Sequence, residues 1–333
     1  MGERVTESIR HLIGALQRFN ESNRPLLEAD RAALYHSFSI PKKAGGLRKI
    51  DAPNPELMTA LRQLKQLFEV KFHTLYHTSA FAYIKGRCTL DAVKRHQANE
   101  SRWFAKLDLH DFFGSTNKEF LMQMLSMIYP FSEVVEDEAG REALSTALEL
   151  AFLRGGLPQG TPISPLLTNI MMIPVDHCLY NTLRSFNGKS FVYTRYADDF
   201  LISSRYDFDI KEIERLVVDV LKKFRAPFSI NEKKTRYGSS SGSNWNLGVM
   251  LNKDNQITIG HKRKKQFQTM VFNYLMDRKN GRRWDISDLQ EMQGLRSYYH
   301  MVEPGIIDSI IRHMNEKCGA DFDASLKADL SCA

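Results

Sequence analysis

FVYTRYADDFLIS, at residues 191–203, holds two adjacent carboxylates between two runs of β-favouring residues. Neighbouring side chains of a strand point to opposite faces, so Asp198 and Asp199 can reach the same ion only if they lie at a turn. The flanking runs favour a hairpin with that turn at its tip. Two adjacent aspartates are also common in solvated turns, so this interpretation depends on the rest of the chain.

A third carboxylate, Asp108, follows a β-favouring run in AKLDLHDFF at residues 105–113. Mg²⁺ takes oxygen ligands, usually one or two carboxylates together with substrate phosphates. Two such ions about 4 Å apart clamp the attacking and the leaving oxygen of a phosphoryl displacement. We therefore predict that Asp108, Asp198 and Asp199 are catalytic residues that hold two Mg²⁺ ions, for which Mn²⁺ can substitute.

A stretch rich in glycine and proline lies between these carboxylates, GGLPQGTPISP at residues 155–165. Glycines let a backbone approach a ligand closely, and prolines stiffen a loop. Ser164-Pro165 favours the start of an apolar helix. Taken alone, the stretch is equally typical of a connector into a buried helix.

Together these segments resemble the palm motifs of reverse transcriptases. Asp108 matches the first metal-binding aspartate, Asp198 and Asp199 match the Tyr-x-Asp-Asp box, and the glycine-rich stretch matches the loop and helix that hold the template and the incoming nucleotide. The resemblance continues in chain order from about residue 35 to about residue 305, through segments at residues 41–54, 80–87, 231–235, 246–249 and 289–304.

The resemblance implies an α+β right-hand polymerase with fingers, a palm built on an antiparallel sheet, and a helical thumb. The expected division is an N-terminal helical extension at 1–36, fingers at 37–103, a palm at 104–249 with a helical insertion at 118–153, a thumb at 250–320 and a tail at 321–333.

The resemblance also implies roles for residues around the carboxylates. Lys43 and Arg48 would clamp the triphosphate with charge-assisted hydrogen bonds, although both are equally typical of surface charges. The residues expected near the incoming deoxynucleotide are Lys43, Arg48, Phe113, Gln159 and Lys234, and those expected near the primer or template are Tyr196, Gly160, Ser164, Leu247 and Gly248.

Phe113 distinguishes the kind of nucleotide. In reverse transcriptases that this chain resembles, an aromatic residue five positions after the first metal-binding aspartate packs under the sugar and collides with a 2′-hydroxyl. Phe113 holds that position and offers the hydroxyl no hydrogen-bond partner, which favours deoxynucleotides. The alternative is that Phe112 and Phe113 are both core residues.

The charge balance suits a polyanionic partner. The chain has 333 residues, a net charge of +7 and 43% hydrophobic residues, so it is an ordinary globular chain with room for two or three subdomains. The run Lys262, Arg263, Lys264 and Lys265 opens a predicted helix in the thumb and would follow a phosphate backbone, although a solvated helix face is also consistent with it.

The sequence predicts a cytoplasmic protein. It shows neither a charged-then-apolar leader nor an apolar run of about 18 residues, so we expect no export and no membrane span. The cysteines have neither metal-site nor disulfide-framework spacing, which favours free thiols in a reducing compartment; they are Cys88, Cys178, Cys318 and Cys332.

The function implied by the resemblance is RNA-directed DNA synthesis. The partners would be deoxynucleotides, the DNA product and an RNA template, which in this group is a dedicated structured non-coding RNA; a protein partner or an oligomer is also compatible. Few residues follow residue 320, so we expect no ribonuclease H or endonuclease domain. That length fits bacterial retron-type and phage-defence-associated enzymes.

Two features place the chain in the broader retron-like group. Residues 91–96 read DAVKRH where retron enzymes show Asn-Ala-x-x-His, and residues 246–248 read NLG where they show Val-Thr-Gly. Two other functions fit the same carboxylates. One is a DNA polymerase of a defence system that extends without a template or primes from a protein hydroxyl, and the other is an inactive RNA-binding scaffold.

Overall fold

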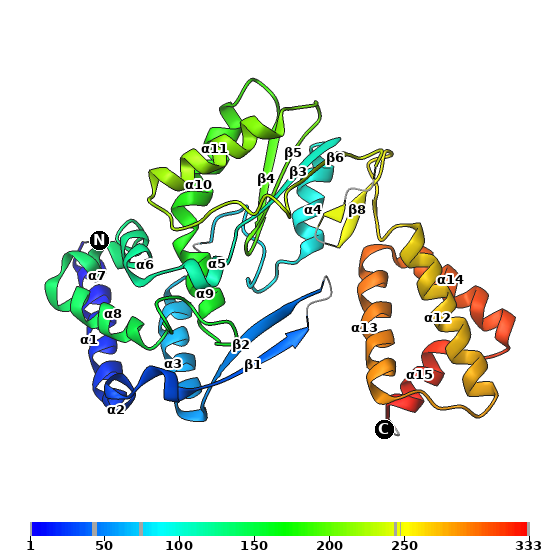
Figure 1. Ribbon diagram of the computed structural model, residues 1–333, viewed down its shortest axis with the longest axis horizontal. Coiled ribbons are helices and arrows are strands. Elements are labelled where there is room, and N and C mark those ends of the chain that lie inside the picture. Colours follow the sequence, from blue (N-terminus) through cyan, green and yellow to red (C-terminus); the bar gives the residue numbers. More distant parts are fainter. Residues whose placement is uncertain (1, 42–44, 73–75, 243–244, 247, 332–333) are drawn as a thin grey trace.

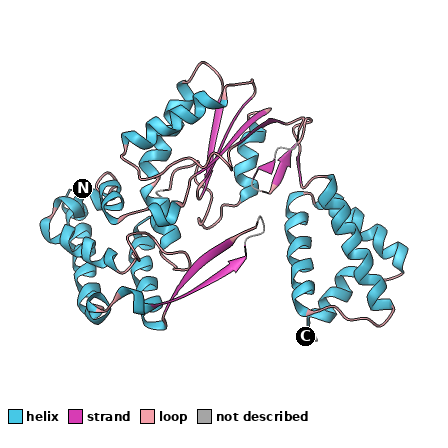
Figure 2. Ribbon diagram, viewed as in Figure 1, coloured by secondary structure: helices cyan, strands magenta, loops and turns pink. Residues whose placement is uncertain are grey.

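The computed structural model describes residues 2–41, 45–72, 76–242, 245–246 and 248–331. Figure 1 shows three parts: helices with a projecting two-stranded ribbon, a sheet with helices on its faces, and a helical C-terminal part. Helices predominate over strands throughout, as Figure 2 shows. The mixed composition agrees with the predicted α+β class.

The N-terminal helices belong to the main core. They are α1 (Gly2–Ser22), α2 (Arg24–Glu28) and a 3-10 helix (Arg31–Leu34). Apolar residues Leu12 and Leu16 of α1 are buried, and the Asn20 amide donates a 2.9 Å hydrogen bond to the Ala143 carbonyl. The segment predicted as an extension is therefore packed against the rest of the molecule.

A two-stranded antiparallel ribbon follows, formed by β1 (Tyr35–Pro41) and β2 (Leu47–Pro53). Most of β1 is exposed, because the ribbon projects from the body of the protein (Figure 1). Helix α3 (Pro55–Phe72) then returns the chain to the core with Leu57, Leu61 and Leu64 buried. These leucines form the face of the helix that packs into the core.

The central sheet has the strand order β4-β5-β3-β6 and is antiparallel throughout. Its strands are β3 (Trp103–Asp108), β4 (Phe191–Tyr196), β5 (Asp199–Ser204) and β6 (Arg236–Ser239). Helices α10 (Ile173–Ser185) and α11 (Ile210–Lys223) cover one face (Figure 1). The predicted hairpin around the paired aspartates is confirmed as β4 and β5.

Helix α4 (Thr89–Ala98) covers the other face of this sheet, although the sequence places it in the fingers. Its buried face carries Val93 and His96. The His96 ring lies 2.8 Å from the Thr194 hydroxyl and 2.5 Å from the Ser203 hydroxyl, which are on β4 and β5. These contacts assign α4 to the sheet.

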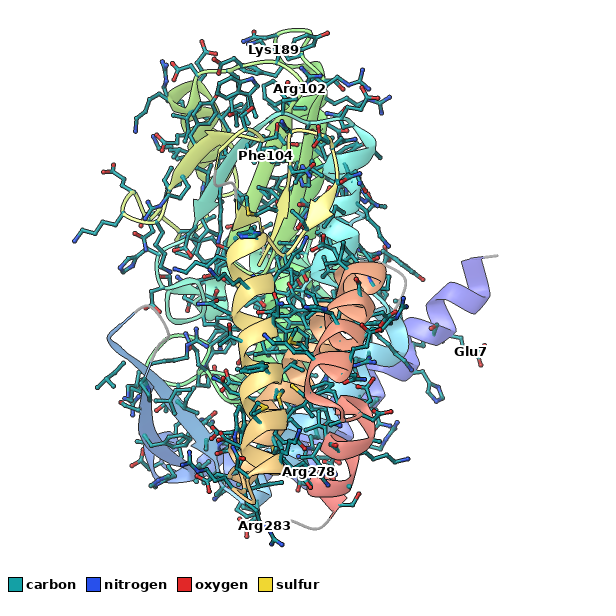
Figure 3. The ribbon with its side chains drawn as sticks, turned by 90° about the vertical axis from the view of Figure 1, so that its right-hand side faces the viewer. Glu7, Arg102, Phe104, Lys189, Arg278 and Arg283 are labelled. Atoms are coloured by element: carbon teal, nitrogen blue, oxygen red, sulfur yellow. The ribbon has the colours of Figure 1, made fainter. Side chains whose placement is uncertain are left out.

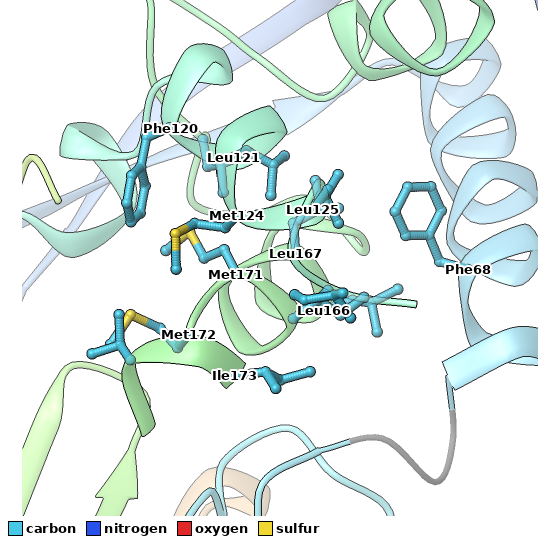
Figure 4. Close-up of a cluster of buried hydrophobic side chains, with 14 of the residues drawn as sticks. Phe68, Phe120, Leu121, Met124, Leu125, Leu166, Leu167, Met171, Met172 and Ile173 are labelled. Atoms are coloured by element: carbon cyan, nitrogen blue, oxygen red, sulfur yellow. The ribbon is translucent and has the colours of Figure 1, made fainter. Parts of the chain in front are cut away.

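Short helices join the sheet to the N-terminal part. They are α5 (Phe112–Ser115), α6 (Lys118–Leu125), α7 (Phe131–Glu136), α8 (Glu138–Glu149) and α9 (Ser164–Met171). Figure 4 shows side chains of α6 and α9, among them Met124 and Met171, together with Phe68 of α3. Residues 131–136 are helical, and Phe131 and Val134 of this helix are buried.

A small antiparallel sheet leads into the C-terminal part. Its strands are β7 (Trp245–Asn246), β8 (Val249–Leu251) and β9 (Ile257–Thr258). The helices that follow are α12 (His261–Lys279), α13 (Ile286–Val302), α14 (Pro304–Cys318) and α15 (Phe322–Ser331).

Helix α15 corrects the prediction of a tail at residues 321–333. Phe322 and Leu326 are buried in a separate hydrophobic core with residues of α12, α13 and α14. Figure 3 shows Arg278 and Arg283 at the far end of the C-terminal helical part, and Arg102 and Lys189 at the opposite end of the molecule.

Two other features bear on the sequence predictions. Over the described residues, no helix has the length and apolar character needed to span a bilayer. Cys88, Cys178 and Cys318 are free thiols, and Cys332 lies outside the described residues.

Candidate active site

The three aspartates lie at one corner of the central sheet. Antiparallel pairing of β3 with β5 places Asp108 directly opposite Asp199. Asp198 lies in the two-residue turn between β4 and β5, where Ala197 has a positive φ of 57°. The Leu109 amide donates a 3.1 Å hydrogen bond to the Asp198 carbonyl, which ties the turn to the end of β3.

Two lysines contact these carboxylates. Lys234 Nζ lies 2.9 Å from one carboxylate oxygen of Asp108 and 3.0 Å from the other. The Asn231 amide donates to the same carboxylate at 3.1 Å. Lys106 Nζ lies 3.0 Å from Asp199 Oδ2. The lysines supply positive charge where the aspartates bring their negative charges together.

The pKa shifts reflect burial and repulsion among the carboxylates. Burial, and next the neighbouring Asp199, raises the pKa of Asp198 to about 6. Burial also raises the pKa of Asp199, although Lys106 opposes that shift. A cation held between the carboxylates stabilises their charged forms.

The residues fit a divalent ion by their chemistry. Carboxylate oxygens are hard ligands, which Mg²⁺ prefers. Across the described residues, no three His, Cys, Asp or Glu side chains form a ready-made cluster for an ion. Lys234 contacts both carboxylate oxygens of Asp108, and Lys106 contacts one oxygen of Asp199, so an ion at this corner would compete with these ammonium groups for the carboxylates.

A buried ion pair stabilises the turn between β4 and β5. The Arg195 guanidinium donates to the Asp176 carboxylate at 2.8 and 2.9 Å, and both side chains are fully buried. A third nitrogen of Arg195 donates to the Ala197 carbonyl at 3.2 Å and to the Asn169 side chain at 3.1 Å. Arg195 therefore contacts the turn that carries Asp198.

The glycine-rich loop lies beside Phe113. The Leu157 amide donates a 3.0 Å hydrogen bond to the Phe113 carbonyl. A Cβ atom on Gly156 would lie 2.2 Å from the Gly114 carbonyl oxygen, so only glycine fits this contact. The Phe113 ring is half-buried and lies 5.7 Å from the Phe112 ring.

Other predicted residues of the loop differ in exposure. Ser164 is 1% exposed, and its hydroxyl lies 2.6 Å from the Thr161 hydroxyl. That contact directs Ser164 into the loop and away from the surface. Gly160 is exposed and has a positive φ of 118°, and Gln159 is half-buried.

The remaining predicted residues lie on several elements. Arg48 is exposed on β2, and Tyr196 is half-buried at the end of β4. Gly248 has a φ of 90° and lies next to Tyr298 of α13, whose hydroxyl is 3.0 Å from the position of a Cβ on that glycine. Lys43 and Leu247 lie outside the described residues.

The basic run at the start of α12 divides into two pairs. Arg263 donates to the Gly248 carbonyl, and Lys264 lies 2.7 Å from the Glu303 carboxylate. Lys262 and Lys265 are exposed. The first pair holds α12 against its neighbours, and the second pair faces solvent.

Three residues near the carboxylates were missed from the sequence. Lys106 and Asn231 contact the aspartates, and Tyr83, which is 55% exposed, lies where Asp198 and Tyr196 raise its pKa, after the larger effect of burial. Lys106 had a usable signal, because residues two apart on a strand share a face with Asp108. Tyr83 and Asn231 lie in segments 80–87 and 231–235, which the resemblance singles out without giving either residue a role.

Comparisons with known proteins agree on one family. Residues 40–272 match the family model described as reverse transcriptase (RNA-dependent DNA polymerase). The chain is 28% identical to the Retron Ec83 reverse transcriptase of Escherichia coli over 302 residues, which cover 87% of this chain and 90% of the relative. It is also 28% identical to the Retron Ec73 reverse transcriptase of Escherichia coli, over 69% of this chain and 73% of the relative.

A solved structure shares the fold. The structure of apo telomerase from Candida tropicalis superposes with a TM-score of 0.51 at 12% identity. The match covers 89% of this chain and 59% of the telomerase chain, so this protein spans about three fifths of that length.

Proposed function

The chain belongs to the reverse transcriptases, the family of RNA-dependent DNA polymerases with the right-hand fold, and we propose that its polymerisation site is the sheet corner formed by Asp108, Asp198 and Asp199. The pairing of Asp108 with Asp199 carries this proposal, because it brings carboxylates from distant parts of the chain to one point. Asp198 joins them through the turn between β4 and β5.

The aspartates would hold two Mg²⁺ ions. When bound, the ions polarise the reacting phosphate and stabilise the charge on the attacking and leaving oxygens. The chain itself orients the reactants. Lys234, whose side chain is 62% exposed, would leave Asp108 and bind the triphosphate, and Arg48 would bind it from the ribbon.

Phe113 would select the sugar. Its backbone is held by the glycine-rich loop, and its ring is half-buried beside Phe112, so it has little freedom to move away from a 2′-hydroxyl. Gln159 and Gly160 would line the nascent base pair, and Tyr196 and Gly248 the primer end. Ser164 would act indirectly, by shaping the loop.

The proposed division keeps the fingers at 37–103, the palm at 104–249 and the thumb from 250, with two changes. Helix α4 (Thr89–Ala98) moves from the fingers to the palm, and α15 joins the thumb. The template would be a structured non-coding RNA of a bacterial retron-like or anti-phage system. The net charge of +7 and the exposed Lys262 and Lys265 favour binding of its phosphates.

The test is incorporation of deoxynucleotides on an RNA template with an annealed DNA primer, with Mg²⁺ and after its removal with a chelator. Asp198→Asn and Asp199→Asn should each reduce incorporation by about 10³-fold or more, with an unchanged thermal midpoint. Asp219→Asn, an exposed position on α11, is the matched control and should keep wild-type activity.

Two results would contradict the proposal. Wild-type rates in either aspartate variant would remove the site from this corner. A product that does not complement the template would favour the alternative of template-independent or protein-primed synthesis. Sequencing of the RNA that copurifies with the protein tests the template, and the absence of a discrete RNA would count against it.

A further inference from the structure

We propose that Asp51 is a positioning residue that holds the β1–β2 ribbon against the loop at residues 154–160 and thereby controls the KM and the sugar selectivity for the incoming nucleotide. The inference rests on the proposed polymerisation site and concerns a residue that does not itself touch the reacting atoms.

Three side chains contact the Asp51 carboxylate. It is 8% exposed and accepts hydrogen bonds from the Ser37 hydroxyl and, at 3.2 Å, from Arg154. Lys49 Nζ lies 3.7 Å from the same oxygen. Burial acts to raise the pKa of Asp51, but the hydrogen bonds from Ser37 and Arg154, together with the charges of Lys49 and Arg154, lower the pKa. The carboxylate is therefore charged when it binds Arg154.

The backbone of Asp51 binds the other end of the same loop. Its amide donates a 2.8 Å hydrogen bond to the Gln159 carbonyl. A Cβ on Gly160 would lie 2.9 Å from Ile50 Cγ2 and 3.0 Å from the Asp51 carbonyl oxygen. One residue of β2 thus holds the loop at Arg154 and at Gln159, on either side of Gly155, Gly156 and Pro158.

The middle of this loop contacts the segment that carries Phe113. Leu157 donates to the Phe113 carbonyl, and Gly156 packs against Gly114. The ribbon, the loop and the Phe113 segment therefore form one chain of contacts. A shift of the ribbon therefore moves Gln159 directly and Phe113 through Leu157, which changes how the incoming nucleotide and its sugar fit between them.

The experiment measures steady-state incorporation of dGTP and GTP opposite a cytosine in a primed RNA template. Asp51→Asn keeps the side-chain shape and the backbone hydrogen bond to Gln159, but it removes the charge that binds Arg154. We expect the KM for dGTP to rise about three- to tenfold, with kcat changed less than about twofold. The preference for dGTP over GTP should fall by a similar factor.

Arg154→Ala removes the other partner of the same ion pair and should reproduce these changes in KM and selectivity. Because the Arg154 side chain is 53% exposed, this substitution should leave the fold intact. The double variant should be no worse than either single variant, because both remove one interaction. Glu149→Gln, which removes a carboxylate from an ion pair with Lys118, is the matched control and should keep the wild-type KM and selectivity.

The outcomes separate this proposal from the proposed function. A wild-type protein that incorporates neither nucleotide contradicts the polymerisation site. A wild-type protein that incorporates dGTP, with Asp51→Asn and Arg154→Ala variants that keep its KM and selectivity, overturns the role of Asp51. So does a result in which the thermal midpoint falls while both kinetic quantities stay unchanged, because that describes a purely structural contact.

Discussion

Lys234 Nζ lies 2.9 Å from Asp108 Oδ1, so an exposed lysine supplies the charge that balances a carboxylate only 4% exposed. The ammonium group sits at the surface end of this contact. We expect this ammonium group to move to the phosphates of a bound nucleotide when Asp108 binds a cation.

Lys234→Gln should therefore raise the KM for the deoxynucleotide about tenfold, because one charge-assisted contact to the triphosphate is lost. The effect on kcat should be smaller. Steady-state incorporation on a primed RNA template measures both. Lys233→Gln, at the exposed neighbouring position, is the control, and equal KM values for the two variants would contradict the triphosphate role of Lys234.

Phe113→Ala should let ribonucleotides enter the site. Removing the ring leaves space for a 2′-hydroxyl, and steric discrimination of this kind is worth roughly 10- to 200-fold in kcat/KM. The ratio of kcat/KM for dGTP and GTP measures it. Phe112→Leu shortens the buried neighbouring side chain and should lower the thermal midpoint while it leaves that ratio unchanged. An unchanged ratio in Phe113→Ala would contradict the role of this ring.

The sheet corner was predictable because its signals are local. The runs around Asp198 and Asp199 carry β-branched and aromatic residues, and strand pairing then requires a turn between them. The register that places Asp108 opposite Asp199 did not follow from either segment alone. The resemblance to reverse transcriptases predicted only that the three carboxylates meet, and the roles of the surrounding residues stay predictions.

Other features depend on contacts between distant residues. Asp51 and Arg154 are 103 residues apart, and neither stands in a pattern that indicates the other. The apolar face of helix α4 is compatible with packing at several places, and its packing against β4, which includes the contacts of His96 with Thr194 and Ser203, assigns it to the sheet. The apolar pattern around Phe322 is too short to predict a helix, so the sequence did not indicate that α15 completes the C-terminal core.

Asp176→Ala should destabilise the protein and reduce activity. It leaves the Arg195 guanidinium charged and fully buried without its carboxylate, and breaking such a pair costs about 3–5 kcal/mol. The turn should also lose order, because Arg195 contacts the Ala197 carbonyl. Denaturant unfolding and incorporation assays measure the two effects.

Arg296→Ala is the control for Asp176→Ala, because it breaks a partly exposed ion pair with Asp323 in the C-terminal helices. That change should cost no more than about 1 kcal/mol. Similar losses of stability in Arg296→Ala and Asp176→Ala would show that burial of the Arg195 pair has no special weight.

His96 should make stability fall in mild acid. Burial, and next Arg95, lowers its pKa from 6.5 to about 3, so the folded protein keeps the ring neutral while the unfolded chain binds a proton below about pH 6.5. The contribution of neutral His96 to the free energy of unfolding is therefore full above about pH 6.5 and declines by up to about 1.4 kcal/mol per pH unit as the pH falls toward 3.

His96→Gln removes this titration, so the free energy of unfolding of the wild type should fall by about 2 kcal/mol more than that of the variant between about pH 7 and about pH 5. Urea unfolding at both pH values measures the difference, with His313→Gln, at an exposed position of α14, as the control. Parallel losses in wild type and His96→Gln would contradict the assignment.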